Sequence, residues 1–232
     1  MKIFAVSDLH LPGNQVKPMD VFGENWTGHF KKIRADWREK VSPEDAVLLA
    51  GDFCWAMTLQ DALSDLAQLS DLPGKKVLIR GNHDYWWSGI TTLRRNAPDE
   101  TFFFLQNDCI RIQDWIFCGS RGWACPGSTD FDAADEKIYL REGERFRLAF
   151  NAVNRERQEG DKLLCMIHFP PFNAKKESSL FTDLFEKNDA DVVVYGHLHQ
   201  SMSGYALEEY RNGIRYCLTS CDLLGFRLAR IV

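Results

Sequence analysis

Side chains able to bind a metal recur in this sequence directly after short apolar runs. They are carboxylates, one amide and several imidazoles, in the order Asp8, His10, Asp52, Asn82, His83, His168, His197 and His199. The chain has six histidines, and five of them belong to this set; only His29 lies outside it. Carboxylate, amide and imidazole ligands together suit Mn, Fe, Zn or a similar borderline ion, rather than Ca²⁺ or a soft thiolate site.

Each of these residues, taken singly, has a plain structural explanation. An Asp that follows a strand commonly caps a helix or turn, which covers Asp8 and Asp52. A histidine beside two prolines, as His168 is, more often packs than ligates. His197 and His199 are two residues apart, a spacing of only moderate specificity. Together, however, the set indicates one metal centre assembled from several loops.

The apolar runs that precede these residues predict buried strands. They cover residues 3–6, 46–50, 77–79, 163–167 and 192–195, and they are apolar throughout, as strands covered on both faces are. Helical patterns lie between them, at 25–40, 59–69, 133–154 and 179–187. Strands that alternate with helices predict an α/β fold, in which ligands bind outside the carboxyl ends of the strands.

Two other segments predict additional pairing. Residues 102–119 read as a hairpin that turns at 106–108, and residues 213–232 read as paired strands, so we expect a mixed sheet or two sheets. Residues 122–135 read as a loop. The strongly charged helix that follows is either a solvated face or a cap over the substrate, which makes 122–154 a candidate cap-like insert.

Length and composition indicate an ordinary globular protein. The 232 residues are 45% hydrophobic and 26% charged, and we expect one domain over 1–232. The net charge of −5 argues against a broad nucleic-acid-binding surface. No run approaches the roughly 18 apolar residues of a spanning helix, so we expect no membrane partner.

The first residues and the cysteines predict a cytoplasmic protein. The opening apolar run is interrupted by Asp8 and is too short and polar for a signal peptide. The seven cysteines are odd in number, and five lie in apolar runs: Cys54, Cys109, Cys118, Cys165 and Cys217. We interpret them as buried thiols in a reducing compartment. No CxxC pair is present, which argues against a structural zinc site.

The metal-binding residues resemble the motifs of one family. Asp8-Leu9-His10, Gly51-Asp52, Gly81-Asn82-His83-Asp84, His168 and Gly196-His197-Leu198-His199 resemble, in order, five motifs of the calcineurin-like metallophosphoesterases. Within that family the chain is similar to small bacterial phosphohydrolases of unassigned substrate. The resemblance implies a four-layer α/β/β/α sandwich of two mixed sheets. It also implies two divalent metal ions, of Mn, Fe, Zn or Ni.

The resemblance also implies a role for each motif residue. Asp8, His10 and His199 would bind the first metal; Asn82, His168 and His197 the second; and Asp52 would bridge both. A metal-bridging hydroxide would then attack the phosphorus in line. His83 would bind no metal and would act as the general acid on the leaving oxygen. Asp84 would hydrogen-bond the His83 ring, or cap a helix over residues 85–95.

Other positions bear on the substrate. The Asp-Arg-Gly triplet that Ser/Thr protein phosphatases carry after this Asp is missing, and Asp84 stands where those enzymes carry Glu, so protein-phosphatase activity is disfavoured. Three residues are candidates for binding phosphate or substrate: Asn82, Arg80 and Arg121. The tryptophans near the motifs (Trp55, Trp86, Trp87 and Trp123) favour packing over a platform for a flat leaving group.

We therefore expect a dimetal phosphohydrolase that acts on a small phosphorylated substrate, a monoester or a diester. A nuclease or a nucleotide or lipid pyrophosphatase of the same superfamily is the alternative, and a non-catalytic binding scaffold is a third. The acidic charge and the lack of a basic tail argue against a nuclease. The charged segment 122–154 argues against a lipid substrate. The sequence leaves open the substrate, the native metal and the oligomeric state.

Overall fold

The strands of the protein form two sheets. The computed structural model describes residues 1–13, 19–129, 131–199 and 205–232. One sheet has the order β11-β1-β2-β3-β4 and the other the order β5-β6-β7-β8-β10-β9. The strands are β1 (Ile3–Val6), β2 (Ala46–Leu49), β3 (Lys75–Leu78), β4 (Phe102–Phe104), β5 (Cys109–Ile112), β6 (Trp115–Ser120), β7 (Lys162–Ile167), β8 (Val192–Tyr195), β9 (Glu208–Arg211), β10 (Ile214–Leu218) and β11 (Ala229–Arg230).

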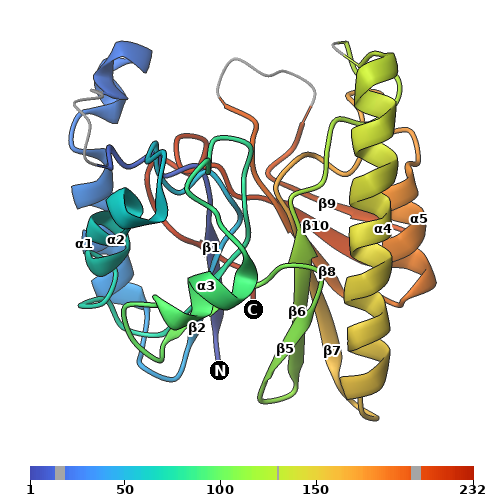
Figure 1. Cartoon of the computed structure of the whole chain (residues 1–232), viewed down its shortest axis with the longest axis horizontal. Coiled ribbons are helices and arrows are strands. Elements are labelled where there is room, and N and C mark those ends of the chain that lie inside the picture. The colour runs from blue at the N-terminus through green and yellow to red at the C-terminus, as the bar shows by residue number, and fades with distance from the viewer. Residues whose placement is uncertain (14–18, 130, 200–204) are drawn as a thin grey trace.

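Helices cover the outer face of each sheet (Figure 1). They are α1 (His29–Lys40), α2 (Leu59–Ala67), α3 (Ile90–Arg95), α4 (Ala133–Glu156) and α5 (Leu180–Lys187), with short 3₁₀ turns at Met19–Phe22 and Glu24–Trp26. The expected helix over 25–40 thus begins at His29. Three of the helices start at hydroxyl or carboxylate caps, which are Thr58, Asp132 and Ser179.

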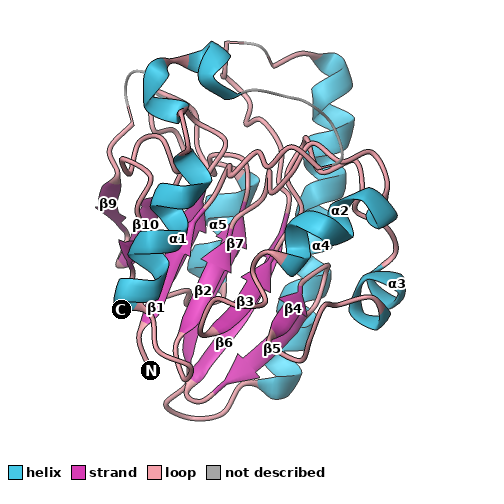
Figure 2. Cartoon of the chain, turned by 90° about the vertical axis from the view of Figure 1, so that its left-hand side faces the viewer, coloured by secondary structure: helices cyan, strands magenta, loops and turns pink. Residues whose placement is uncertain are grey.

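Alternating side chains of the strands build three apolar layers. In β1, Ile3 and Ala5 belong to a core between the two sheets, whereas Phe4 and Val6 belong to a core under α1 and α2. The third core lies between the six-stranded sheet and helices α4 and α5. Figure 2 shows the five-stranded sheet from the side that α1 and α2 cover. The arrangement is the α/β/β/α sandwich of two mixed sheets that the resemblance implied.

Parallel pairing brings the polar strand ends to one edge. Strands β1 to β4 pair in parallel, as do β6 with β7, β7 with β8, and β8 with β10. Their carboxyl ends therefore point the same way within each sheet. At that edge the two sheets meet, because Ser7 and Ser220 form a parallel bridge. The amide of Cys221 donates to the carbonyl oxygen of Ser7 at 3.1 Å.

The hairpin predicted over residues 102–119 was wrong. Residues 102–119 are not one hairpin, because β4 pairs with β3 in one sheet and β5 pairs with β6 in the other. The chain crosses between the sheets near residues 105–108, and the tight turn lies at 113–114. Residues 213–232 do contain paired strands, as predicted, and their partners lie elsewhere in the chain. Strand β10 pairs with β8 and β9, while β11 pairs with β1.

The charged helix of the candidate insert packs against the sheet. Helix α4 buries Phe146, Ala149 and Phe150 in the core over β6 and β7. The expected loop ends at Asp132, where α4 begins. In the described parts of the chain, no helix combines the length and the apolar composition needed to cross a bilayer.

Candidate metal centre

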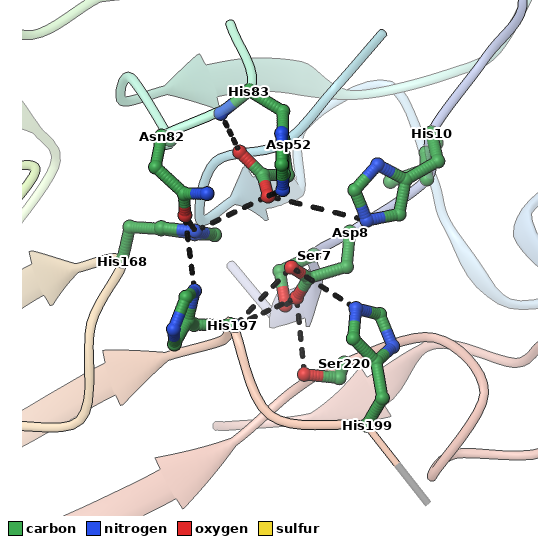
Figure 3. Close-up of polar contacts among 12 residues, drawn as sticks. Ser7, Asp8, His10, Asp52, Asn82, His83, His168, His197, His199 and Ser220 are labelled. Carbon is green, nitrogen blue, oxygen red and sulfur yellow. Dashed lines mark hydrogen bonds and ion pairs between the residues drawn. The ribbon is translucent and has the colours of Figure 1, made fainter. Parts of the chain in front are cut away.

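The predicted metal ligands converge at the edge where the sheets meet (Figure 3). The loops after β1, β2 and β3 carry Asp8, His10, Asp52 and Asn82 from the five-stranded sheet. The loops after β7 and β8 carry His168, His197 and His199 from the six-stranded sheet. Among the described residues, two separate groups have ligand atoms within 4.8 Å of one another: Asp8, His10 and His199, and Asp52, His168 and His197.

The first group is built around the fully buried carboxylate of Asp8. The hydroxyls of Ser7 and Ser220 donate to Asp8 Oδ2 at 2.5 and 3.0 Å, and the amide of His197 donates to the same atom at 3.0 Å. His199 Nε2 lies 4.0 Å from Asp8 Oδ1. The other ring nitrogen of His199 hydrogen-bonds Asp222 at 3.0 Å, which orients the ring. Asp8 is therefore fixed before any ion binds.

The second group gathers around Asn82. Its Oδ1 lies 2.8 Å from His168 Nε2 and 3.0 Å from His197 Nδ1. His168 Nδ1 lies 2.9 Å from the carbonyl oxygen of Ala50, which can only accept, so Nδ1 carries a proton. When the ring is protonated, Nε2–H donates to the Asn82 oxygen; when it is neutral, Nε2 presents a lone pair to that oxygen, and a bound cation shared by the two atoms would take the place of the proton.

Asp52 lies between the two groups. Its Oδ2 is 3.4 Å from His168 Nε2 in one group and 4.0 Å from His10 Nε2 in the other. Its Oδ1 accepts from the amide of His83 at 2.8 Å. Because a carboxylate can bridge two ions, this place is the one a shared ligand requires.

The donor set fits two divalent ions. The ring of His10 is 4% exposed, its Nδ1 has no hydrogen-bond partner among the described residues, and its Nε2 is too far from Asp52 for a hydrogen bond. Two ligand atoms that share one ion at about 2.0–2.2 Å each lie on the order of 3–4 Å apart, which matches the gaps around Asp52 and Asp8. Imidazole nitrogen with carboxylate and amide oxygen suits Mn, Fe, Zn or Ni.

The protonation states of the imidazoles differ in the metal-free protein. Burial lowers the pKa of His10 and of His197 to about 3, so both rings are neutral at pH 7 and ready to ligate. Burial also disfavours the charged form of His168. The Asp52 carboxylate beside His168 outweighs that effect and raises the pKa to about 9. A metal ion that binds there must displace the proton of His168.

The backbone of the site takes conformations that few residues adopt. Asp8, His10, Asp52 and His197 all have positive φ, between 48° and 72°. Non-glycine residues with positive φ are uncommon and gather at functional sites. At Gly81 the carboxylate of Asp52 packs against the backbone itself, since a Cβ there would lie 2.1 Å from Asp52 Oδ1. The motif glycine therefore makes room for the candidate bridging ligand.

The structure gives Asp84 a place that neither prediction described. Its carboxylate is fully buried and accepts from the amides of Asp52, Phe53 and Gly81 at 2.7–2.9 Å, and from the indole of Trp86 at 2.9 Å. The described contacts include no hydrogen bond from Asp84 to the His83 ring. Nor does Asp84 cap a helix, because α3 begins only at Ile90. Asp84 instead joins the two loops that carry Asp52 and Asn82.

His83 lies at the rim of the site, with 36% of its side chain exposed and Nε2 4.0 Å from Asp52 Oδ2. It borders a cavity of about 390 Å³ that is lined by four polar and four apolar side chains. The polar ones are His10, His83, His199 and Asp222; the apolar ones, which form an apolar wall, are Met19, Phe22, Trp26 and Trp55. Trp55 stacks on the ring of His10, with centroids 4.8 Å apart.

Arg80 and Arg121 do not line this cavity. Both line a second cavity, together with Trp87, whereas Trp86 is buried in the core. Trp123 packs against the guanidinium of Arg121 at 4.5 Å. The two arginines are thus brought together with each other, but not into the pocket that borders His10 and His199.

Sequence reasoning missed three polar residues that hold the ligands: Ser7, Ser220 and Asp222. Ser220 and Asp222 follow the apolar strand β10, so they obey the same rule that identified the ligands. The signal was therefore present.

Comparison with known proteins agrees with this geometry. The family model described as calcineurin-like phosphoesterase matches residues 1–201. No curated protein sequence matches the chain.

Two solved structures are similar over nearly the whole chain. A phosphopantetheinyl hydrolase from Mycobacterium tuberculosis is 12% identical, with a TM-score of 0.56, over 100% of this chain and 95% of that one. A protein of unknown function from Aquifex aeolicus is 15% identical, with a TM-score of 0.52, over 99% and 95% of the two chains. At such low identity these likenesses show the fold alone. The family match covers every motif from Asp8 to His199, and on that ground the chain belongs to the calcineurin-like phosphoesterases, a family of metal-dependent phosphoester hydrolases.

Proposed function

We propose that this protein hydrolyses a small phosphorylated substrate, a monoester or a diester, at a two-metal centre. The observation that carries the proposal is the position of Asp52 between two groups of ligand atoms at one sheet edge. Asp8, His10 and His199 would hold one ion, Asn82, His168 and His197 the other, and Asp52 both. When bound, two such ions neutralise the phosphoryl oxygens and acidify the attacking water.

The chain's own residues supply the remaining steps. Asp8 and Asp52 fix the ligand cage from the five-stranded sheet, and their hydrogen-bonded carboxylates keep its geometry constant. His83 is the general acid in the proposal, because its exposed ring borders the cavity beside Asp52 and can donate a proton to the leaving oxygen. Since Asp84 contacts the backbone rather than His83, its proposed role is to position Asp52 and Asn82.

The apolar wall of the cavity bears on the leaving group. Trp55 contacts both His10 and His83, with centroids 4.8 and 4.6 Å apart, and Met19 and Trp26 extend the same wall. A leaving group with an aromatic or apolar part would bury it there. The cavity gives no support to the nuclease alternative, because none of the described residues that line it is Lys or Arg. A cytoplasmic location belongs to the same proposal.

Hydrolysis of two chromogenic esters tests the proposal. p-Nitrophenyl phosphate and bis-p-nitrophenyl phosphate are given to metal-stripped protein, and then Mn, Fe, Ni, Zn or Mg is added back. We expect metal-dependent turnover that Asp52→Asn and His83→Ala each lower by about 10²-fold or more. The exposed Asp71→Asn is the matched control and leaves turnover unchanged. Metal uptake without turnover of any ester would favour the scaffold alternative.

Trp55→Ala separates the leaving-group wall from the chemistry. We expect a higher KM for p-nitrophenyl phosphate, and an unchanged KM for an ester with a small alkyl leaving group such as methyl phosphate. If the KM changes equally for both esters, the apolar wall does not bind the leaving group.

A further inference from the structure

A second cavity, of about 270 Å³, is lined by three arginines. They are Arg80 from the loop after β3, Arg121 from the end of β6, and Arg145 from α4. Among the described residues, no Asp or Glu lines the cavity. Three guanidinium groups with no carboxylate among them give the wall a strong positive charge.

A buried carboxylate behind the wall holds two of these arginines in place. Glu142 is fully buried and accepts from Arg145 at 2.7 Å, from Arg121 at 3.3 Å and from the hydroxyl of Ser120 at 2.9 Å. Trp123 packs against the guanidinium of Arg121 from another direction. One carboxylate balances only one of the three positive charges, so the wall keeps a net positive charge in a fixed geometry.

Donors exceed acceptors around this cavity. Ser88 Oγ and the Nε atoms of Arg80 and Arg121 are buried and lack a hydrogen-bond partner among the described residues. The indole of Trp87 donates to Gln106 Oε1 at 2.8 Å, and an indole can only donate, so the amide NH₂ of Gln106 remains a donor. A lining of guanidinium, amide and hydroxyl donors is what recognises a phosphate or a carboxylate.

The cavity adjoins the loops of the second metal group. Arg80 is two residues before Asn82, and the carbonyl oxygen of Arg121 accepts from the amides of His168 and Phe169 at 3.0 and 3.2 Å. The apolar cavity beside His10 lies at the first metal group instead. The candidate metal centre therefore has an apolar pocket next to one group and a cationic pocket next to the other.

We propose that the cavity of Arg80, Arg121 and Arg145 binds a second anionic group of the substrate, a phosphate or a carboxylate, while the scissile phosphoryl group lies at the metal centre. The inference rests on the proposed function and narrows its substrate to a phosphoester whose organic part carries another negative charge. Arg145 lies on α4, within the segment of residues 122–154, so this segment would contribute to substrate binding through one side chain.

Non-hydrolysable phosphonates test the inference by binding rather than by turnover. Propylphosphonate and alkane bisphosphonates of three to five carbons are titrated calorimetrically into the metal-loaded protein. We expect one bisphosphonate to bind at least about tenfold more tightly than propylphosphonate, because one charged hydrogen-bonding group is worth about that factor. We expect Arg145→Gln and Arg80→Gln each to abolish that gain, and Arg145→Lys to restore part of it.

Arg147→Gln is the matched control. It removes a guanidinium from the same helix, where Arg147 pairs with the exposed Glu144 and does not line the cavity. We expect Arg147→Gln to bind the bisphosphonate more tightly than propylphosphonate by the same factor as the unchanged protein does. No gain at any chain length, or a gain that persists in Arg145→Gln, would overturn the inference.

The outcomes separate this inference from the proposed function. If bisphosphonate binds more tightly in a way that depends on Arg145, but the protein hydrolyses no ester, the proposed reaction is wrong and the cationic pocket is still supported. If the protein hydrolyses esters but binds no bisphosphonate more tightly than propylphosphonate, the proposed reaction is supported and the inference about the cationic pocket is wrong.

Discussion

The buried carboxylate of Asp84 joins the two loops that carry Asp52 and Asn82. It accepts from four backbone amides and from the Trp86 indole; the amides are those of Asp52, Phe53, Cys54 and Gly81. A carboxylate suits this place because both of its oxygens only accept. The position of the candidate bridging ligand therefore depends on a neighbour that would bind no ion itself.

Asp84→Asn tests that dependence. The new NH₂ group would face backbone N–H donors, so we expect the free energy of unfolding to fall by about 2–3 kcal/mol. We also expect less bound metal per protein, because Asp52 loses its support. Urea unfolding and elemental analysis measure the two effects, with the exposed Asp114→Asn as the control. A variant with full stability and full metal content would contradict the role given to Asp84.

The pairing of His168 with Asp52 predicts how the metal-free protein titrates. With a folded pKa of about 9 against an ordinary value of 6.5, the folded state binds the extra proton between these two values. His168 therefore stabilises the metal-free protein fully below about pH 6.5, and that contribution is lost as the pH rises through about 9. The ring ¹³C shift of His168, followed by NMR against pH, measures the pKa.

Asp52→Asn provides the comparison for this titration. It removes the negative charge of Asp52, which raises the pKa of His168 more than burial lowers it. We therefore expect the pKa of His168 to fall below 6.5. An unchanged midpoint in Asp52→Asn would show that the proton is held by another group.

Helix α4 carries Arg145 to the cationic cavity, and its start is fixed by a capping box. Asp132 accepts from the amides of Ala134 and Asp135 at 2.7 and 3.1 Å, while Asp135 accepts from the amide of Asp132 at 3.0 Å. Asp132→Ala should lower the free energy of unfolding by about 1 kcal/mol. Chemical denaturation measures the loss, and Asp132→Ser should recover most of it. A loss of the same size in both variants would argue against the cap.

Local pattern predicted the elements of this fold better than it predicted their partners. Residues 3–6 and 192–195 match β1 and β8, because an apolar run bounded by polar residues is a local property. That β4 and β5 belong to different sheets depends on which faces pack between the sheets, and no local pattern carries that information. The same holds for β11, whose partner β1 lies at the other end of the chain.

The site was predictable to the same extent. Residues directly after strands, such as Asp8 and His168, were found because parallel strands deliver their ends to one edge. The partners of Arg121 were not, since Glu142 lies 21 residues away on α4. The sequence also predicted which cysteines are buried, and it did so for most of those it singled out. Of the five cysteines in apolar runs, four are buried as predicted, and Cys109 is half-buried.

The candidate ligands come from both sheets, at the edge where Ser7 also makes backbone hydrogen bonds to Thr219 and Cys221. Asp8, His10, Asp52 and Asn82 come from one sheet, and His168, His197 and His199 from the other. Without ions, two buried carboxylates, Asp8 and Asp52, must rely on hydrogen bonds and on the charge of His168. Ions that bind only the folded state therefore stabilise the whole molecule by mass action.

Metal removal should consequently lower the melting temperature of the entire chain rather than loosen one loop. When the free concentration of the ion is about 1,000 times its dissociation constant, binding adds about 4 kcal/mol to the free energy of unfolding. This corresponds to a rise in melting temperature of roughly 8–16 °C for a domain of this size. Calorimetry with and without a chelator measures the shift. Asp52→Asn is the informative comparison, because it removes the shared ligand and should make the melting temperature nearly insensitive to the chelator. If chelation leaves the wild-type transition unchanged, or if the shift persists undiminished in Asp52→Asn, then the ions do not link the two sheets through Asp52.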